Sequence, residues 1–382
     1  MNSPADFFAE FPPVSKDQWL ARIAQDLKGK PIEELYWQLN RETSVDPFGH
    51  ADDLAGLPEP LSLASVAWEI NEDVDAGDWT AMNRQAIEAL AFGADSLYFP
   101  LVEKNVSAAL ETLLHRIHLD FISLHFGGNG TTAGPAAVLS ALGDLARQQG
   151  LGPEQLRGSL YYDPAAEPGR IHDWRYLEEL LRYAGETLPG FRCLTVDGRA
   201  DFNSAAAVPH ELAAVVRKGL AYLEKLEARG LEAVRVAGQM QFAFYIGNSY
   251  FVEIAKLRAF KILWINALKA WDVEPAYPVL DVRFAPGAYT DTLYSNMIRA
   301  TTMAMSAVLG GANRLTVLPY DAGREAQAAY PRAFARRIAR NVQHLLKLET
   351  GLTDAPDPAS GSYYLEQLTG QLATAAWSMV KP

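Results

Sequence analysis

Cysteine is almost missing from this sequence of 382 residues. Cys193 is the only one, so no disulfide can form within the chain and no cluster of thiolates can hold a metal ion. Cys193 opens an apolar segment, LTV. We therefore expect it to be a buried packing residue rather than a nucleophile.

Long apolar runs and an excess of positive charge are also missing. No segment approaches the roughly 20 apolar residues that a helix needs to cross a bilayer, and the start, MNSPADFFAEFPPV, lacks the basic and then apolar layout of a secretory signal. Lys and Arg number 34 against 46 Asp and Glu, a net charge of −12, which argues against nucleic acid and anionic membranes as partners. We expect a cytoplasmic protein.

What the sequence does contain is a regular alternation of apolar strand-like runs with long helical patterns. Strands that alternate with helices indicate a parallel sheet, and eight such units close a (β/α)8 TIM barrel. An open doubly wound sheet would show the same alternation, but no GxGxxG turn follows the first run. We therefore predict an α/β barrel over residues 61–382. The strands are expected at 65–70, 96–101, 121–126, 158–162, 193–198, 233–239, 277–284 and 314–319.

Residues 1–60 do not fit this alternation. Ser15 and Gln18 have the spacing of a capping box ahead of a short amphipathic helix, and a turn-rich segment follows. We predict an N-terminal arm that wraps the barrel or reaches for a partner chain. At the other end, GSYYLEQLTGQLATAAWSMV predicts a final helix.

In barrels of this kind, functional groups lie at the carboxyl ends of the strands. The glycine-rich loop at 127–130 could be a phosphate site or a simple tight turn, and we favour the turn. His115 and His118 form a close pair without a neighbouring acid to complete a metal site, so we expect a solvated helix face and no metal. The other polar groups expected at this rim are His125, Tyr161, Tyr162, Asp163, Asp197–Asp201, Gln239, Arg283 and Asp321.

Four longer segments carry a resemblance to a known family. They are FYIGNSYFVEIAKLRAFKILW (244–264), YSNMIRATTMAMSAVLGGANRLTVLPYD (294–321), RRIARNVQHLLKLETG (336–351) and DPASGSYYLEQLT (357–369). They resemble the substrate barrel of the adenosylcobalamin-dependent methylmalonyl-CoA mutases. The opening, WLARIAQDLKGKPIEELYWQLNRETSVDPFGHADD, is similar to the N-terminal arm of the small, non-catalytic subunit of heterodimeric mutases.

The resemblance implies a barrel that admits an acyl-CoA along its axis and is capped by a cobalamin-binding domain, so its catalytic positions can be compared one by one. Where the catalytic chain has a Tyr-His pair after the fifth strand, this sequence has Gly198 and Arg199. Tyr161 stands in place of a substrate-binding glutamine after the fourth strand, and Gln239 aligns with an arginine after the sixth. The resemblance thus implies four degenerate catalytic positions.

Two further arginines of the family's site are only partly matched. The arginine that fixes the acyl carboxylate falls on Ile171, with Arg170 one position away. From the polar loop after the seventh strand only Arg283 remains. Arg283 and Arg199 are therefore the residues left that could contact an acyl-CoA, and no catalytic residue is expected.

The resemblance also bears on the cofactor and the partner. The family's cobalamin domain binds cobalt through a histidine in a DxHxxG motif, which this chain lacks, so we expect that domain to be absent and adenosylcobalamin to bind through a catalytic large subunit. The implied function is that of a small-subunit barrel, paired as a heterodimer in methylmalonyl-CoA/succinyl-CoA isomerisation. Two alternatives remain: a catalytic subunit with an altered acyl-CoA substrate that takes cobalamin from a separate chain, and a homo-oligomer, such as a homodimer, that binds CoA esters.

The segment EIAKLRAFK contains three basic residues with a simpler interpretation. We expect Lys256 and Lys261 on the solvated outer face of a helix. Arg258 is expected to form ion pairs between helices.

Overall fold

The structure is a computed structural model that describes residues 11–41, 43–55, 67–100, 106–127, 134–164 and 174–380. Most of the glycine-rich loop at 127–130, together with Arg170 and Ile171, lies outside the described residues. Within the described ranges, no helix combines the length and apolar character that a bilayer crossing requires.

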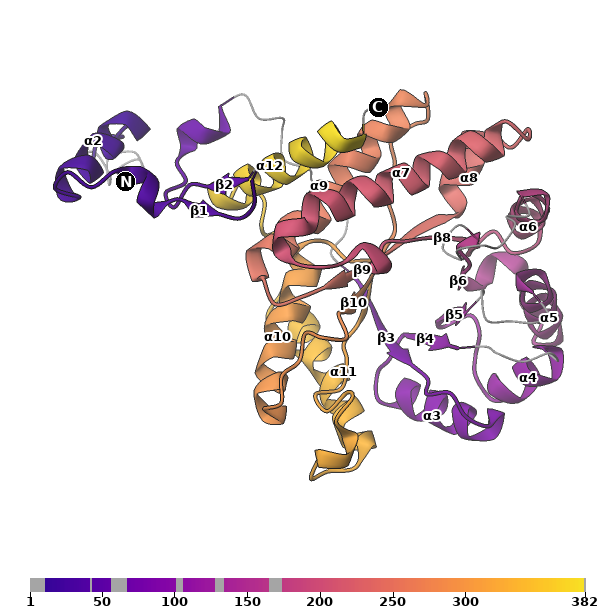
Figure 1. Ribbon diagram of the computed structural model, residues 1–382. Helices are drawn as coiled ribbons and strands as arrows, with labels where there is room; N and C mark the ends of the chain where they lie inside the picture. Colours follow the sequence, from indigo (N-terminus) through magenta and orange to yellow (C-terminus); the bar gives the residue numbers. More distant parts are fainter. Residues whose placement is uncertain are drawn as a thin grey trace, which may run out of the picture.

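Strands β3 to β11 form one parallel barrel (Figure 1). Their order in the sheet is β7-β6-β5-β4-β3-β11-β10-β9-β8. Cys193 alone separates β7 from β8, so these are two halves of one strand: the first half pairs with β6 and the second with β9. The sheet therefore closes, and the predicted (β/α)8 fold is confirmed. The strands are β3 (Glu69–Asp73), β4 (Ser96–Phe99), β5 (Ser123–Gly127), β6 (Arg157–Tyr161), β7 (Phe191–Arg192), β8 (Leu194–Asp197), β9 (Met240–Ile246), β10 (Leu280–Phe284) and β11 (Arg314–Thr316).

Helices surround the barrel, and the outward-facing strand residues pack beneath them. Leu97, Leu160, Phe242 and Val282 are examples of these outward residues, and all are buried. The surrounding helices are α3 (Trp79–Ala91), α4 (Val106–Leu113), α5 (Pro135–Gln148), α6 (Trp174–Thr187), α7 (Val208–Glu227), α8 (Ala233–Gln239), α9 (Tyr250–Ala270), α10 (Leu293–Leu309) and α11 (Arg332–Leu348). The predicted final helix is α12 (Tyr363–Val380), which packs across α7 and α9 (Figure 1).

The prediction for the sixth strand was wrong. Residues 233–239 form helix α8, and the strand is the next segment, β9. In α8 only Ala233 and Val236 are buried, which is the spacing of a helix with one covered face, whereas six of the seven residues of β9 are buried. Gln239 therefore precedes the sixth strand instead of following it.

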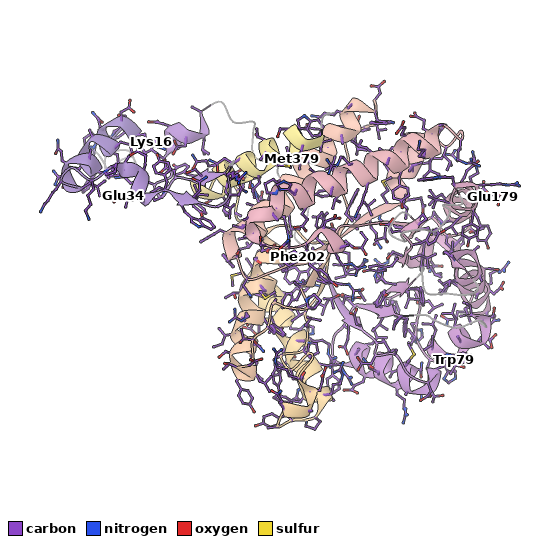
Figure 2. All side chains as sticks on the ribbon, in the orientation of Figure 1. Lys16, Glu34, Trp79, Glu179, Phe202 and Met379 are labelled. Carbon is purple, nitrogen blue, oxygen red and sulfur yellow. The ribbon has the colours of Figure 1, made fainter. Side chains whose placement is uncertain are left out.

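The N-terminal arm projects from the barrel beside α12, and Lys16 and Glu34 mark it in Figure 2. The predicted capping box is confirmed, since the Ser15 backbone N–H donates to Gln18 Oε1 at 3.0 Å and the Ser15 hydroxyl accepts from the Gln18 N–H. The elements of the arm are α2 (Lys16–Asp26), η1 (Ile32–Leu35), β1 (Trp37–Gln38), β2 (Ser44–Val45) and η2 (Ala51–Leu54).

The second half of the arm holds it to the barrel: Leu39 and Val45 join the main hydrophobic core, and η2 packs against α12. Asn40 Nδ2 donates to the Ala206 carbonyl at 3.0 Å, and Gln371 Nε2 of α12 donates to the Ser44 carbonyl at 3.1 Å. Helix α2 buries none of its residues, and the side chains of Phe11 and Trp37 are 73% and 47% exposed. The arm thus presents apolar side chains that the barrel of its own chain leaves uncovered.

The prediction that Lys256 and Lys261 lie on a solvated face was wrong. Lys256 is fully buried, and Arg258 and Lys261 are each 3% exposed. Helix α9 has no solvated face at this point because α7, α10 and α12 pack around it. Lys256 Nζ donates to the Tyr245 carbonyl at 2.7 Å and lies 2.7 Å from Glu253 Oε2.

The interhelical ion pairs predicted for Arg258 are confirmed. Its guanidinium group pairs with Asp357 and, at 2.7 Å, with Glu366 of α12. The Glu366 pair fastens the final helix to α9, and the Asp357 pair fastens the turn that precedes this helix.

The buried Lys256 has a second acidic neighbour, which gives a prediction about pH. Glu211 Oε1 lies 3.5 Å from Lys256 Nζ, and burial raises the pKa of Glu211 from 4.5 to about 7 in spite of that lysine. Between these two values the folded chain binds more protons at Glu211 than the unfolded chain does. The stabilisation from Glu211 is therefore complete below pH 4.5 and is lost as pH rises through 7.

We expect Glu211→Gln to remove this dependence. The difference in unfolding free energy between wild type and variant should change by about 1–3 kcal/mol between pH 5 and pH 7.5, measured by urea denaturation. The comparison uses the difference between the two proteins because a second group also makes stability depend on pH. Burial and Arg314 lower the pKa of His125 to about 4, so its contribution to stability increases with pH in an overlapping range. Glu224→Gln, on the exposed face of the same helix, is the control; parallel curves for wild type and Glu211→Gln would contradict the prediction.

Candidate functional site

The inward-pointing side chains of the described barrel strands are polar, except that of Ala243 in β9. Side chains alternate between the two faces of a strand, and hydrogen bonds and ring contacts across the barrel identify the set that points inward. Barrels of this fold usually fill the same space with Val, Ile and Leu. We call the enclosed space the lumen. Its side chains are Glu69, Asn71, Asp73, Ser96, Tyr98, Ser123, His125, Ser159, Tyr161, Thr195, Asp197, Gln241, Tyr245, Asp281, Arg283, Arg314 and Thr316.

Asp281 is the centre of this polar set. It is fully buried on β10, and its Oδ1 accepts from Arg314 Nε at 2.8 Å. Its Oδ2 accepts from the Tyr161 hydroxyl and lies 3.4 Å from Arg283 Nε. Burial alone would raise the pKa of Asp281. The positive charges of Arg314 and Arg283 have a larger effect in the other direction, and they hold this pKa well below its usual range.

Tyr161 spans the lumen. It is the last residue of β6 and is 6% exposed, and its hydroxyl oxygen lies 3.1 Å from Arg314 Nη2 and 3.2 Å from Arg283 Nη2. Burial raises the pKa of Tyr161 to about 12, so the phenol is neutral and donates its proton to Asp281. Side chains from β6, β10 and β11 are thus in direct contact across the axis, which closes the lumen at this level.

The mouth of the lumen, at the carboxyl ends of the strands, holds Gly198 and Arg199. The Arg199 side chain donates to both carboxylate oxygens of Asp197, at 2.9 and 2.6 Å, and its guanidinium carbon lies 5.3 Å from the centre of the Tyr161 ring. A Cβ atom at Gly198 would lie 2.5 Å from Val215 Cγ2. In this arrangement no side chain larger than hydrogen fits at Gly198.

The second arginine proposed for substrate contact, Arg283, lies deeper. It is 7% exposed, pairs with Asp73 from β3, and its guanidinium carbon stands 4.6 Å from the Tyr98 ring centre. The structure therefore brings Tyr161, Arg199 and Arg283 together, with each arginine already bound to a carboxylate.

Other groups expected at the rim are dispersed. Gln239 is at the opposite end of the barrel, where its Oε1 accepts from the Cys193 backbone N–H at 3.3 Å. Cys193 itself is fully buried, as predicted for a packing residue. Burial raises the pKa of its thiol, so the reactive thiolate form is disfavoured. Asp163 is buried beneath the mouth and accepts from the Tyr222 hydroxyl and from the Asp197 N–H. Asp321, after β11, is also buried.

Sequence analysis missed the inner residues of the lumen because it considered only the ends of the strands. Asp281, Arg314 and Gln241 occur in the middle or at the start of their strands. Their signal was the period of two, in which every inward position of strands such as EINED and LDVRF is polar while the outward positions are mostly apolar.

Metal binding has no support in the described part of the chain. The residues in these ranges contain no group of three or more His, Cys, Asp or Glu side chains that could hold an ion. His115 and His118 are exposed, as predicted, but they do not lie on a helix, because α4 ends at Leu113.

Comparison with known proteins gives consistent results. Residues 104–382 match the family model described as methylmalonyl-CoA mutase. The chain is 32% identical to the methylmalonyl-CoA mutase small subunit of Porphyromonas gingivalis over 97% of this chain and 63% of that protein. It is 31% identical to the small subunit of Streptomyces virginiae, over 98% of this chain and 64% of that protein. The chain is 27% identical to the methylmalonyl-CoA mutase large subunit of Streptomyces virginiae, over 97% of this chain and 56% of that protein. The chain thus spans less than two thirds of the length of these relatives.

Proposed function

The chain belongs to the methylmalonyl-CoA mutase family, and from this premise we propose that it is a non-catalytic barrel of the small-subunit type. It would pair with a separate catalytic chain, and the assembly would interconvert methylmalonyl-CoA and succinyl-CoA. The names of the relatives, small and large subunit, indicate a mutase built from two kinds of chain. Similarity to the small subunits supports the same role for this one.

The closed lumen is the observation that carries the non-catalytic role. An acyl-CoA that entered along the axis would have to displace the Tyr161 hydroxyl from Asp281 and separate Asp281 from Arg314. Separating a buried carboxylate from its guanidinium partner costs several kcal/mol. Binding energy spent in this way is not available to lower the barrier of a reaction.

The residues at the mouth do not fit the cofactor that the family implies. None of the seven histidines follows an aspartate at the spacing of DxHxxG, and His125, which lies in the lumen, is enclosed by Ser159 and Arg314. Gly198 also lacks room for an aromatic side chain in this arrangement. We propose that adenosylcobalamin is bound by the partner chain.

Substrate contact by Arg199 and Arg283 stays a prediction. Arg199 would first have to release Asp197, and Arg283 would have to release Asp73. These ion pairs favour a role in holding the mouth and the lumen closed.

The proposal is tested by native mass spectrometry of the assembly purified gently through a tag on this chain from its own organism. We expect a one-to-one complex with a longer chain that carries cobalamin. Recovery of a homo-oligomer without a second kind of chain would contradict the subunit role. It would also revive the alternative in which this chain binds CoA esters by itself.

A further inference from the structure

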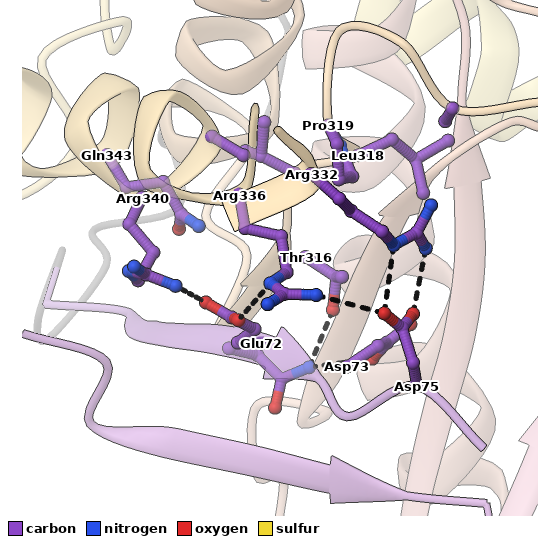
Figure 3. Close-up of a pocket in the computed structure, with 14 residues that line it drawn as sticks. Glu72, Asp73, Asp75, Thr316, Leu318, Pro319, Arg332, Arg336, Arg340 and Gln343 are labelled. Carbon is purple, nitrogen blue, oxygen red and sulfur yellow. Dashed lines mark hydrogen bonds and ion pairs between the residues drawn. The ribbon is translucent and has the colours of Figure 1, made fainter. Parts of the chain in front are cut away.

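A pocket of about 150 Å³ lies between the wall of the barrel and helix α11, beside the lumen (Figure 3). It is enclosed by the carboxyl ends of β3 and β11 on one side and by helix α11 on the other. A cavity of similar size in an engineered protein holds benzene, so the space suits a ligand of about six non-hydrogen atoms. The lining residues used below are Glu72, Asp75, Ala322, Arg332, Arg336 and Arg340.

Three arginines from one face of α11 line the pocket. Arg332, Arg336 and Arg340 are spaced four residues apart, so their side chains follow one stripe along the helix. Figure 3 shows the stripe facing Glu72 and Asp75 across the pocket. Arg332 is at the exposed end, and Arg340 is at the buried end.

The charges are unevenly distributed along the stripe. At the exposed end, Arg332 pairs with Asp75 at 2.8 Å and with Glu325 at 2.7 Å. At the buried end, Glu72 is the single carboxylate that faces both Arg340 and Arg336, the latter at 3.6 Å. Arg336 also reaches Asp75 at 3.0 Å. The three arginines are thus matched in number by three lining carboxylates, Glu72, Asp73 and Asp75, but Arg340 shares its one carboxylate with Arg336.

Arg340 has unused hydrogen-bonding capacity. It is 2% exposed, and its Nη1 donates to Glu72. Among the described residues, its Nε and Nη2 have no hydrogen-bond partner, and its guanidinium carbon lies 6.0 Å from the centre of the Phe92 ring. Buried donors without an acceptor are costly and rare, and a bound group with an acceptor oxygen would satisfy them.

The walls add an apolar component. Val317, Leu318, Pro319 and Ala339 line the pocket together with the arginines. We propose that this pocket binds a small carboxylate with a short apolar tail. The carboxylate group accepts from Arg340 at the buried end, and the tail lies against these apolar side chains. Guanidinium and carboxylate groups match in charge and in geometry.

This site does not depend on the proposed subunit function. It shares Asn71, Asp73 and Thr316 with the lumen, but it contains neither Asp281 nor Arg199, and it binds its ligand whether or not the chain has a partner.

The test is calorimetric titration of the full chain with butyrate, which has six non-hydrogen atoms, beside butyramide, which has the same shape without charge, and inorganic phosphate. We expect butyrate to bind with a dissociation constant around a millimolar and butyramide to bind at least about tenfold more weakly. Arg340→Gln should weaken butyrate binding by at least about tenfold. Arg337→Gln, on the exposed face of the same helix, should leave butyrate binding unchanged.

A second variant covers the case in which Arg340→Gln fails to fold. Ala322, at the edge of the pocket, is half-buried, so Ala322→Leu should fill the entrance and abolish binding without removing a charge. Equal binding of butyramide and butyrate would overturn the proposal, as would butyrate binding that survives both variants. Binding of phosphate without butyrate would refute the carboxylate assignment, and absence of binding by all three probes would refute the site.

Discussion

Replacing Asp281 with asparagine is expected to destabilise the folded chain by about 3–5 kcal/mol, the usual cost of removing one partner from a buried ion pair. Asp281 is fully buried and accepts from Arg314 and Tyr161, with Arg283 also beside it. Asparagine keeps the shape but removes the charge. The buried Arg314 would then lose its close carboxylate and keep only Glu69 at 3.9 Å among its ion pairs in the described residues, while Arg283 would keep Asp73.

The measurement is urea unfolding of wild type and Asp281→Asn at pH 7. Asp26→Asn is the matched control, since Asp26 pairs with Arg22 at 3.1 Å on the exposed helix α2, and exposed pairs of this kind contribute about 0.3–0.5 kcal/mol. A loss below 1 kcal/mol for Asp281→Asn would show that the lumen is hydrated enough to solvate the free arginines.

Removing residues 1–60 is expected to abolish assembly with the proposed catalytic chain, with the affinity falling by at least about 100-fold. The arm leaves Phe11 and Trp37 largely exposed, and helix α2 buries none of its own residues. Obligate interfaces commonly bury more than about 2,000 Å², and an arm that projects from the barrel adds contact area without rearrangement of the barrel.

Size-exclusion chromatography of the mixed chains measures the loss of assembly, and urea unfolding of the shortened chain checks that the barrel still folds. A folded barrel is expected because, of the described arm residues, Leu39 and Val45 are the two that belong to the main core, and few hydrogen bonds, such as that from Gln371 to Ser44, join arm and barrel. A shortened chain that still assembles would locate the interface on the barrel itself.

The sequence predicted the barrel because each wall strand combines an apolar outer face with a flanking amphipathic helix. The prediction failed at 233–239, where Val234 and Val236 resemble a strand. Val234 is 55% exposed, whereas Val236 is buried, so the period is that of a helix. The strand itself, MQFAFYI, is a more continuous apolar run, which is typical of a strand covered on both sides.

The ion pairs were less predictable than the strands. Asp281 and Arg314 are 33 residues apart in the chain, and they meet because the register of β10 and β11 places them opposite one another. Nothing in the local sequence encodes that register. Lys256 was misassigned for a related reason, since the helices that cover α9 follow from the tertiary arrangement and not from the helix itself.

The polar lumen also has a consequence for how the chain responds to temperature. Exposure of apolar surface raises the heat capacity on unfolding, and exposure of polar surface lowers it. A barrel with Asp281, Arg314 and their neighbours on its axis buries polar surface where others bury aliphatic side chains. Its heat-capacity increment per residue is therefore smaller than that of an ordinary barrel, and its stability curve is broader and flatter across the temperatures at which the protein works.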